Sequence, residues 1–193
     1  MPRTLAAFRR FTNMLTDEEC AVTQTRRLFL RPFEPADLEP YAEIRSSPSV
    51  ARFLPGGEPG AKSAADKVRA GWTPWGRDAW NAGRYAQWAV IETSNSRLIG
   101  HLGLRFLADI GETELLYMID EPWWKKGLAT EGGHAAVAFA RDRLGLKCLV
   151  AFVLPENGGS IAVLGKLGFR KDGAQLIFGL DAVRYVRTLT DPN

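Results

Sequence analysis

A turn at residues 121–127 separates a predicted strand, ELLYMID, from a helix that the spacing of small and apolar residues predicts from about residue 128. The first turn of a helix leaves its backbone N–H groups without partners inside the helix. Here those groups belong to Lys126, Gly127, Leu128, Ala129 and Thr130. Gly127 tolerates a left-handed backbone and a close ligand, and the helix dipole attracts anions. The turn is therefore a candidate pyrophosphate site, with a plain tight turn as the alternative.

The helix after this turn has one face made mostly of small residues. Its members recur every three or four positions: Ala129, Gly133, Ala136, Val137, Ala140 and Leu144. Gly132 and Gly133 each lower helix propensity by about 1 kcal/mol relative to alanine. We therefore expect this helix to approach the sheet or a ligand closely.

A second segment, PENGGSIAVLGKLGF at residues 155–169, predicts a short helix closed by Gly168. Together the two segments resemble the GNAT superfamily of N-acetyltransferases, and within it the branch that acetylates the N-termini of ribosomal proteins (RimJ/RimL-like). That branch typically has Trp-Gly-x-Gly-x-Ala-Thr-Glu-Ala at the turn, where this chain has Trp124, Lys125, Lys126, Gly127, Leu128, Ala129, Thr130, Glu131 and Gly132. The family pattern Asn-x-x-Ser, then Lys-x-Gly-Phe, matches Asn157, Ser160, Lys166, Gly168 and Phe169. The resemblance covers about residues 25–190 and departs from the branch at Lys125, which replaces a frequent glycine.

The predicted elements that position these segments are a strand, helices, a three-strand meander, a helix, a buried strand, a short helix and final strands. This order indicates the α/β class with a mixed sheet. The resemblance implies the GNAT-like acyl-CoA N-acyltransferase fold, a central, mostly antiparallel twisted sheet with helices on both faces. We expect an N-terminal extension over residues 1–24, a GNAT domain over 25–193, and a loop at FLPGGEPG, residues 53–60.

The resemblance implies transfer of the acetyl group of acetyl-CoA to a primary amine by direct attack in a ternary complex. The branch favours a protein or peptide N-terminus as acceptor. The alternatives are a small-molecule amine such as a polyamine or an aminoglycoside, and a catalytically silent CoA-binding regulator. A nucleotide-binding α/β protein is a further class, but the phosphate-loop motif Gly-x-x-x-x-Gly-Lys-Ser/Thr is missing from the sequence.

The same resemblance assigns residues to the cofactor. The amides from Lys126 to Thr130 would bind the pyrophosphate, and the strand segment Tyr117, Met118 and Ile119 would meet the pantetheine arm and the acetyl carbonyl. A backbone N–H at that carbonyl would stabilise the developing negative charge. Asn157 would hydrogen-bond the pantetheine arm, and Lys166 and Arg170 would contact the 3′-phosphate or remain solvated charges.

Two side chains are candidates for proton transfer. The attacking amine must lose a proton near pH 7, and Glu114 is the candidate base, with an exposed strand-end carboxylate as the alternative reading. A water chain or His101 could also take the proton. Ser160 lies where the family places a residue near the CoA sulfur, so it is the candidate proton donor to the leaving thiolate, with helix capping as its alternative role.

Composition limits the remaining classes. A net charge of +3 without a block of like charges fits one anionic ligand better than nucleic acid. Cys20 and Cys148 show no metal-site spacing and suggest unpaired thiols in a reducing compartment, with Cys148 in a predicted buried strand. No apolar run approaches roughly 18 residues, so we expect no membrane contact. We also expect no metal, and a cytoplasmic location. An organellar transit peptide at the N-terminus is the alternative. The acceptor, the oligomeric state (a homodimer is one option), and the roles of residues 1–24 and of the Trp-rich stretch 72–88 are not fixed by the sequence.

Overall fold

The computed structural model describes residues 23–69 and 87–189. Most of the predicted N-terminal extension, and Trp72, Trp75, Trp80 and Tyr85 of the Trp-rich stretch, lie outside the described residues. The last residues of the predicted extension form strand β1 (Thr23–Gln24), which pairs with β2 (Leu28–Arg31). The described sheet therefore begins at Thr23.

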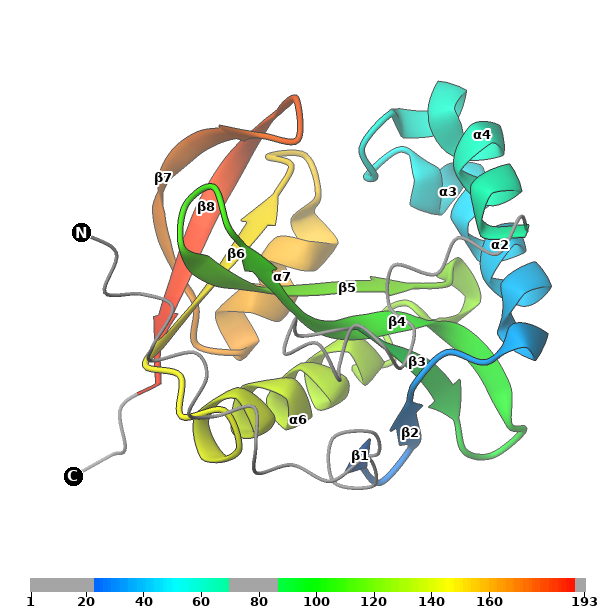
Figure 1. Ribbon diagram of the computed structural model, residues 1–193, viewed down its shortest axis with the longest axis horizontal. Coiled ribbons are helices and arrows are strands. Elements are labelled where there is room, and N and C mark those ends of the chain that lie inside the picture. The colour runs from blue at the N-terminus through cyan, green and yellow to red at the C-terminus, as the bar shows by residue number, and fades with distance from the viewer. Residues whose placement is uncertain (1–22, 70–86, 190–193) are drawn as a thin grey trace.

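An eight-stranded sheet lies at the centre of the described structure, in the spatial order β1-β2-β3-β4-β5-β6-β8-β7 (Figure 1). The remaining strands are β3 (Gln87–Glu92), β4 (Arg97–Leu107), β5 (Glu112–Ile119), β6 (Cys148–Val153), β7 (Arg170–Ile177) and β8 (Leu180–Thr188). Six of the seven pairings are antiparallel, and β5–β6 is parallel. The predicted mixed, mostly antiparallel sheet is confirmed.

Helices cover both faces of this sheet (Figure 1). One face carries α6 (Leu128–Asp142) and α7 (Gly158–Lys166), and the other carries α2 (Leu38–Ser46), α3 (Pro48–Ala51) and α4 (Gly57–Arg69). Successive strand residues point to opposite faces, so Trp88 packs in the α6 core and its neighbour Ala89 in the α2–α4 core. Short 3₁₀ turns, η1 (Pro35–Asp37) and η2 (Glu121–Trp123), precede α2 and α6.

Two local predictions are wrong. The predicted loop at residues 53–60 ends early, because α4 begins at Gly57 and Pro59 lies in its first turn, where a missing N–H removes no helical bond. Cys148 is exposed rather than buried, because it is the first residue of β6. Burial begins at the next position, Leu149.

The expected close packing of α6 is confirmed by its two adjacent glycines. A Cβ added at Gly132 would lie 2.9 Å from Cδ1 of Leu102 on β4. A Cβ at Gly133 would lie 2.5 Å from Cδ1 of Leu167, just beyond α7. The helix thus contacts both the sheet and α7 too closely for a larger residue at these positions.

The central feature of the sheet is the separation of β5 from β6. The two strands share one register pair, Glu114 with Val150, and no further pair joins the described strands beyond it. On its other edge β5 is approached closely by β4, since a Cβ at Gly100 (φ +146°) would lie 1.9 Å from the Met118 carbonyl oxygen. The segment Tyr117–Ile119 therefore follows the point where β5 leaves β6 while β4 still supports it.

Candidate active site

The turn before α6 has the conformation that its glycine predicts. Gly127 is the N-cap residue and adopts φ +77°, in the left-handed region. The first helical bond runs from the Glu131 N–H to the Gly127 carbonyl, at 3.0 Å. None of the amides from Lys126 to Thr130 donates to another described residue. They are consequently available to a ligand.

Lys125 also adopts a left-handed backbone, with φ +59°. This residue stands where the family frequently has glycine, and the chain keeps the conformation although it has replaced the residue type. A side chain in this region costs roughly 1–2 kcal/mol. The turn therefore holds two left-handed residues, Lys125 and Gly127, around Lys126.

A hydrogen-bonded clamp ties this turn to the edge of the sheet. The Glu131 carboxylate accepts from the Thr25 hydroxyl at 2.6 Å, from the Arg27 amide at 2.8 Å and from Arg27 Nε at 2.7 Å. Arg27 Nη1 then donates to the Lys126 carbonyl at 2.9 Å. Partial burial raises the pKa of Glu131, but the bonds from Thr25 and Arg27 outweigh it and leave the pKa lowered. The charge of an ionised Glu131 beside the candidate phosphate site is thus balanced by Arg27.

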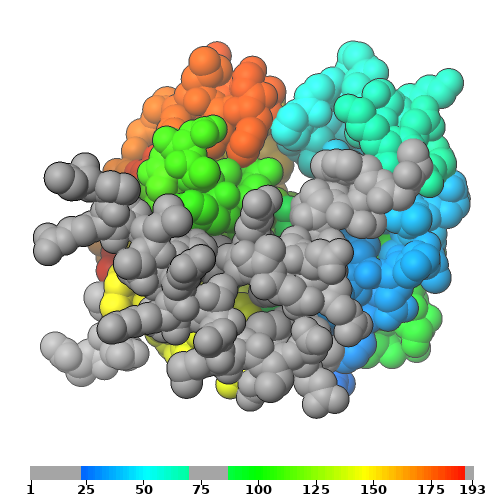
Figure 2. Space-filling model, viewed as in Figure 1, coloured from blue at the N-terminus to red at the C-terminus, as the bar shows by residue number. Residues whose placement is uncertain are grey.

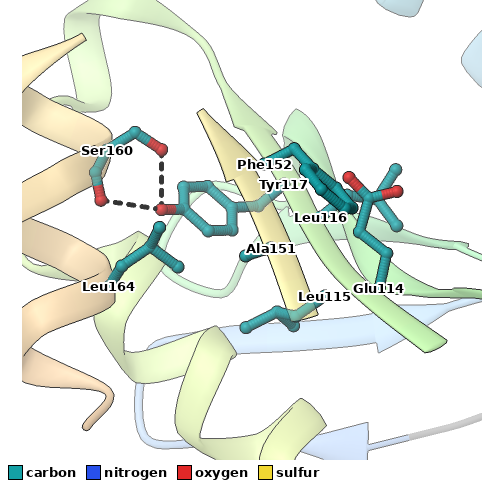
Figure 3. Close-up of a pocket in the computed structure, with 8 residues that line it drawn as sticks. All are labelled: Glu114, Leu115, Leu116, Tyr117, Ala151, Phe152, Ser160 and Leu164. Atoms are coloured by element: carbon teal, nitrogen blue, oxygen red, sulfur yellow. Dashed lines mark hydrogen bonds between the residues drawn. The ribbon is translucent and has the colours of Figure 1, made fainter. Parts of the chain in front are cut away.

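A small pocket of about 60 Å³ opens where β5 and β6 part (Figure 3). It brings together two predicted catalytic residues and one predicted cofactor residue, Glu114, Ser160 and Tyr117. Leu164 of α7 and Phe152 of β6 also line it. In Figure 3 Glu114 and Ser160 lie on opposite sides of the Tyr117 ring. The pocket therefore connects the α7 side of the sheet with the opposite face.

On the α7 side, the Tyr117 hydroxyl bonds to Ser160 Oγ at 2.8 Å and donates to the Ser160 carbonyl at 3.1 Å (Figure 3). Burial raises the pKa of Tyr117 to about 12, so its phenol keeps its proton at neutral pH. Asn157 caps α7, because its Oδ1 accepts from the Ser160 amide at 3.0 Å. The capping role of Asn157 leaves its Nδ2 group without a partner among the described residues.

On the opposite face, Glu114 is 4% exposed, so the exposed strand-end carboxylate is ruled out. Both Arg105 donors that reach it bind the same oxygen, with Nε at 2.9 Å and Nη2 at 2.5 Å from Oε2. Oε1 has no partner among the described residues, and the residue lines the pocket. Burial raises the pKa of the Glu114 carboxyl, and Arg105 opposes that rise only in part.

The other predicted residues lie around this pocket rather than in it. Met118 packs in the α2–α4 core and Ile119 in the α6 core, so only their backbone is available. His101 is buried under α2, with Nδ1 2.8 Å from the Tyr41 hydroxyl. Burial lowers the pKa of His101 well below its usual range, which keeps the ring neutral. Lys166 and Arg170 are exposed.

Three side chains of the site escaped the sequence analysis: Arg105, Arg27 and the phenol of Tyr117. Arg105 stands opposite Glu114 in the β4–β5 register. The pair follows from a four-residue turn at 108–111, because Leu107 stands opposite Glu112 and each strand counts outward from there to Arg105 and Glu114. Arg27 and Tyr117 meet partners about 100 and 43 positions away in the chain, for which no local pattern exists.

Among residues 23–69 and 87–189, no cluster of three or more His, Cys, Asp or Glu side chains is arranged to hold a metal ion. In the same part of the chain no helix has the length and apolar character needed to cross a membrane.

Comparisons with known proteins agree with this geometry. The family model of the acetyltransferase (GNAT) domain matches residues 27–170. A relative from Bacillus subtilis, named as the uncharacterized N-acetyltransferase YnaD, is 29% identical over 154 residues, which are 77% of this chain and 82% of that protein.

Solved structures share the fold at lower identity. A GNAT-family acetyltransferase from Bacillus anthracis superposes with a TM-score of 0.68 at 22% identity, covering 87% of this chain and 98% of the other. RimJ from Mycobacterium smegmatis, solved in complex with CoA-disulfide, gives a TM-score of 0.69 at 20% identity and 86% coverage of both chains.

Proposed function

The chain belongs to the GNAT acetyltransferase family, and from this premise we propose that it moves the acetyl group of acetyl-CoA to a primary amine, with a peptide or protein N-terminus as the favoured acceptor. The observation that carries the proposal is the unpaired row of amides from Lys126 to Thr130, beside the point where β5 leaves β6. A row of free N–H groups at a helix N-terminus suits a diphosphate. The gap between β5 and β6 suits the pantetheine arm, which follows the diphosphate in CoA.

The residues present fit the cofactor. At the turn, a Cβ at Gly127 would lie 3.6 Å from Arg27 Nη2, and Lys126 places its ammonium 4.6 Å from the Trp123 ring. Lys126 therefore brings positive charge to the turn, and Arg27, paired with Glu131, lies against the turn without filling it. Along the arm, Asn157 Nδ2 and the β6-facing backbone of Tyr117–Ile119 would supply the polar contacts. Acetyl-CoA would bring an activated thioester, and the chain's own groups would orient it.

Glu114 would accept the proton of the attacking amine. Its free atom, Oε1, belongs to a carboxyl whose pKa is raised by burial, and a base works best when its pKa is near the working pH. His101 is a poorer base here, since its Nδ1 is engaged by Tyr41 and the ring is not a pocket residue.

Ser160 would donate a proton to the departing CoA sulfur, and Tyr117 would support it through a hydrogen bond. The serine hydroxyl alone is a weak acid, but the buried phenol of Tyr117 is within hydrogen-bonding distance of its oxygen at 2.8 Å. As Ser160 gives up its proton, the Tyr117 hydrogen would turn from the Ser160 carbonyl to Ser160 Oγ and stabilise the oxygen that remains. Ser160 would thus serve as donor while Asn157 fixes its position at the start of α7.

Charge on the acceptor face favours a monoamine over a polyamine. Three carboxylates around the pocket are already paired: Glu114 with Arg105, and both Glu112 and Asp172 with Arg184. A polyamine or aminoglycoside needs free carboxylates for its extra ammonium groups, and these three are engaged. A peptide N-terminus needs one base and backbone contacts.

The test has two stages. A thermal shift compares acetyl-CoA, CoA and ATP, because a ligand at 100 times its dissociation constant should add about 2.7 kcal/mol of stability. Release of free CoA thiol is then measured with a panel of peptides, spermidine and an aminoglycoside. We expect a shift with both CoA forms and turnover with peptides. No shift at saturating acetyl-CoA would contradict the proposal, and a shift without turnover would indicate a silent CoA-binding protein.

A further inference from the structure

The carboxylate of Glu114 is held asymmetrically. Arg105 directs both Nε and Nη2 at Oε2, at 2.9 and 2.5 Å, and leaves Oε1 free. Two donors that converge on one oxygen fix the position of Oε2 and leave Oε1 as the carboxylate oxygen without a partner among the described residues. Arg105 is itself 38% exposed in its side chain, whereas Glu114 is 5% exposed. The arginine therefore lies between the buried carboxylate and solvent.

A third residue holds Arg105 from the other side. The guanidinium lies 4.4 Å from the ring centre of Phe178, a cation–π contact. Phe178 is at the tip of the β7–β8 hairpin, whose last paired residues are Ile177 and Leu180. In Figure 2 the β7–β8 hairpin lies against the β4–β5 hairpin at the molecular surface.

The backbone of Phe178 makes this contact conspicuous. Phe178 and Gly179 adopt φ +53° and +76°, as in a tight hairpin turn that favours Asn-Gly at these positions. A bulky residue with positive φ is an outlier, and such outliers gather at functional sites. Since 49% of the Phe178 surface remains exposed, burial of the ring does not account for its presence.

We propose that Arg105 is the positioning residue of the general base, and that Phe178 is a specificity-determining wall of the acceptor site that keeps Arg105 in place. This inference rests on the proposed function. Arg105 turns Glu114 so that Oε1, and not Oε2, meets the incoming amine. Phe178, with its free ring edge beside Arg105, contacts the residue that follows the amine.

The same arrangement sets the ionisation of Glu114. Arg105 is the charged side chain that contacts the carboxylate from β4, and the nearest residues of β6, Val150 and Phe152, do not ionise. On β5 the neighbouring acid Glu112 is engaged by Arg184 at 2.6 Å. Burial raises the pKa of Glu114 and Arg105 lowers it. Removing Arg105 should therefore move the pKa upward, so that a larger fraction of Glu114 is protonated at neutral pH.

The experiment measures the pH profile of kcat/KM for a peptide acceptor in Arg105→Gln, Arg105→Lys and Phe178→Leu. Loss of positioning should lower kcat/KM of Arg105→Gln by about tenfold to a hundredfold, and its acid limb should move to higher pH. Arg105→Lys keeps the charge but not the two-donor contact. The acid limb of its pH profile should therefore move less than that of Arg105→Gln, while its kcat/KM should still fall. Phe178→Leu should cost about twofold to fivefold, the size of an exposed cation–π contact, and should change the preference among peptides.

A matched control and a direct readout separate positioning from general damage. Arg69→Gln breaks an exposed ion pair with Glu39, between α4 and α2, and should leave the acid limb in place. The Glu114 carboxyl is titrated by ¹³C NMR, with its resonance assigned through Glu114→Gln, and acetyl-CoA affinity should stay at the wild-type value.

Two results would overturn the inference. One is an Arg105→Gln enzyme with the wild-type profile and titration while Glu114→Gln is impaired. The other is a Glu114→Gln enzyme with wild-type rates, because Arg105 would then have no base to position. If the wild type acetylates no amine, the proposed function fails. The role of Arg105 is refuted separately if the Glu114 carboxyl titrates in Arg105→Gln as it does in the wild type.

Discussion

On the α6 side of the sheet the candidate site consists of backbone amides between Lys126 and Thr130, whereas on the opposite face it consists of the charged side chains Glu114 and Arg105. The first group comes from one continuous stretch of chain. The second comes from β4 and β5 and is supported by the β7–β8 hairpin. The two halves meet at the gap where β5 and β6 part.

This contrast predicts how each half responds to substitution. A site made of amides depends on backbone conformation, so it should tolerate new side chains except at Gly127. A site made of side chains depends on particular atoms, so it should lose activity on isosteric changes that leave the backbone alone. Cofactor affinity should therefore follow the turn, and acceptor turnover should follow Glu114 and Arg105.

The largest effect is expected at Glu114. Glu114→Gln preserves shape but removes the base, and general-base catalysis contributes about 10²–10⁴-fold. We expect kcat/KM for the acceptor to fall by about 10²-fold or more, with acetyl-CoA affinity unchanged. Loss of acetyl-CoA binding in this variant, measured by calorimetry, would break the division between the two halves.

The pH dependence of the wild type follows from the same residue. Glu114 acts as a base only when ionised, and burial raises its pKa, so kcat/KM should fall with decreasing pH at a higher pH than an ordinary glutamate would give. By linkage, a raised folded-state pKa stabilises the fold at acid pH, and this contribution is lost as pH rises through that pKa. An acid limb at the pKa of an exposed carboxyl would argue for another base.

Ser160 tests whether the amide half contains an exception, since it is a side chain on the α7 side. Ser160→Ala should lower kcat by about tenfold to a hundredfold through loss of the proton donor, and should change the KM for acetyl-CoA little. Tyr117→Phe removes the supporting hydroxyl and should give a smaller loss in kcat. Turnover that is unchanged in Ser160→Ala would restrict Ser160 to its place in the α7 cap.

Gly127 tests the amide half directly. Gly127→Ala places a side chain at φ +77° and should cost roughly 1–2 kcal/mol of folding stability. Relief of that strain would distort the turn, so acetyl-CoA affinity should fall by about tenfold, which corresponds to about 1.4 kcal/mol.

Gly111 provides the matched control for this variant. It adopts φ +69° in the β4–β5 turn, and a Cβ there would meet nothing within 4 Å. Gly111→Ala should lose similar stability in a thermal melt and keep its acetyl-CoA affinity. Equal affinity losses in both variants would mean that the turn before α6 is not the phosphate site.

The contrast also explains what the sequence could predict. Lys126–Thr130, Asn157 and Ser160 lie in short motifs whose geometry follows from a helix start, so the sequence could place them at the starts of α6 and α7, while their roles toward the cofactor stay predictions. Glu114 was selected by its place on a strand, but the sequence did not predict its burial or its partner. That partner, Arg105, is nine positions away, and the residue that contacts Arg105, Phe178, comes from another hairpin. Side-chain pairs across a sheet depend on register and packing, which one sequence does not display. The same reason hid the Arg27–Glu131 clamp, which joins residues 104 positions apart.

The smallest effect is expected at Lys125, where the turn departs from the family pattern. Its φ of +59° costs roughly 1–2 kcal/mol for a side chain, while a glycine gives back about 0.4–1 kcal/mol through the greater freedom of the unfolded chain. The strain is at least as large as the entropy, so Lys125→Gly should raise the free energy of unfolding by up to about 1.6 kcal/mol. Lys125→Ala removes the same charge but keeps the strained backbone, so it should show no gain in urea unfolding. If both variants bind acetyl-CoA as the wild type does, the amides alone hold the diphosphate. If both variants bind it more weakly by the same factor, and the difference disappears at high salt, the charge of Lys125 contributes to binding as well. The amide half would then depend on a side chain in addition to its backbone.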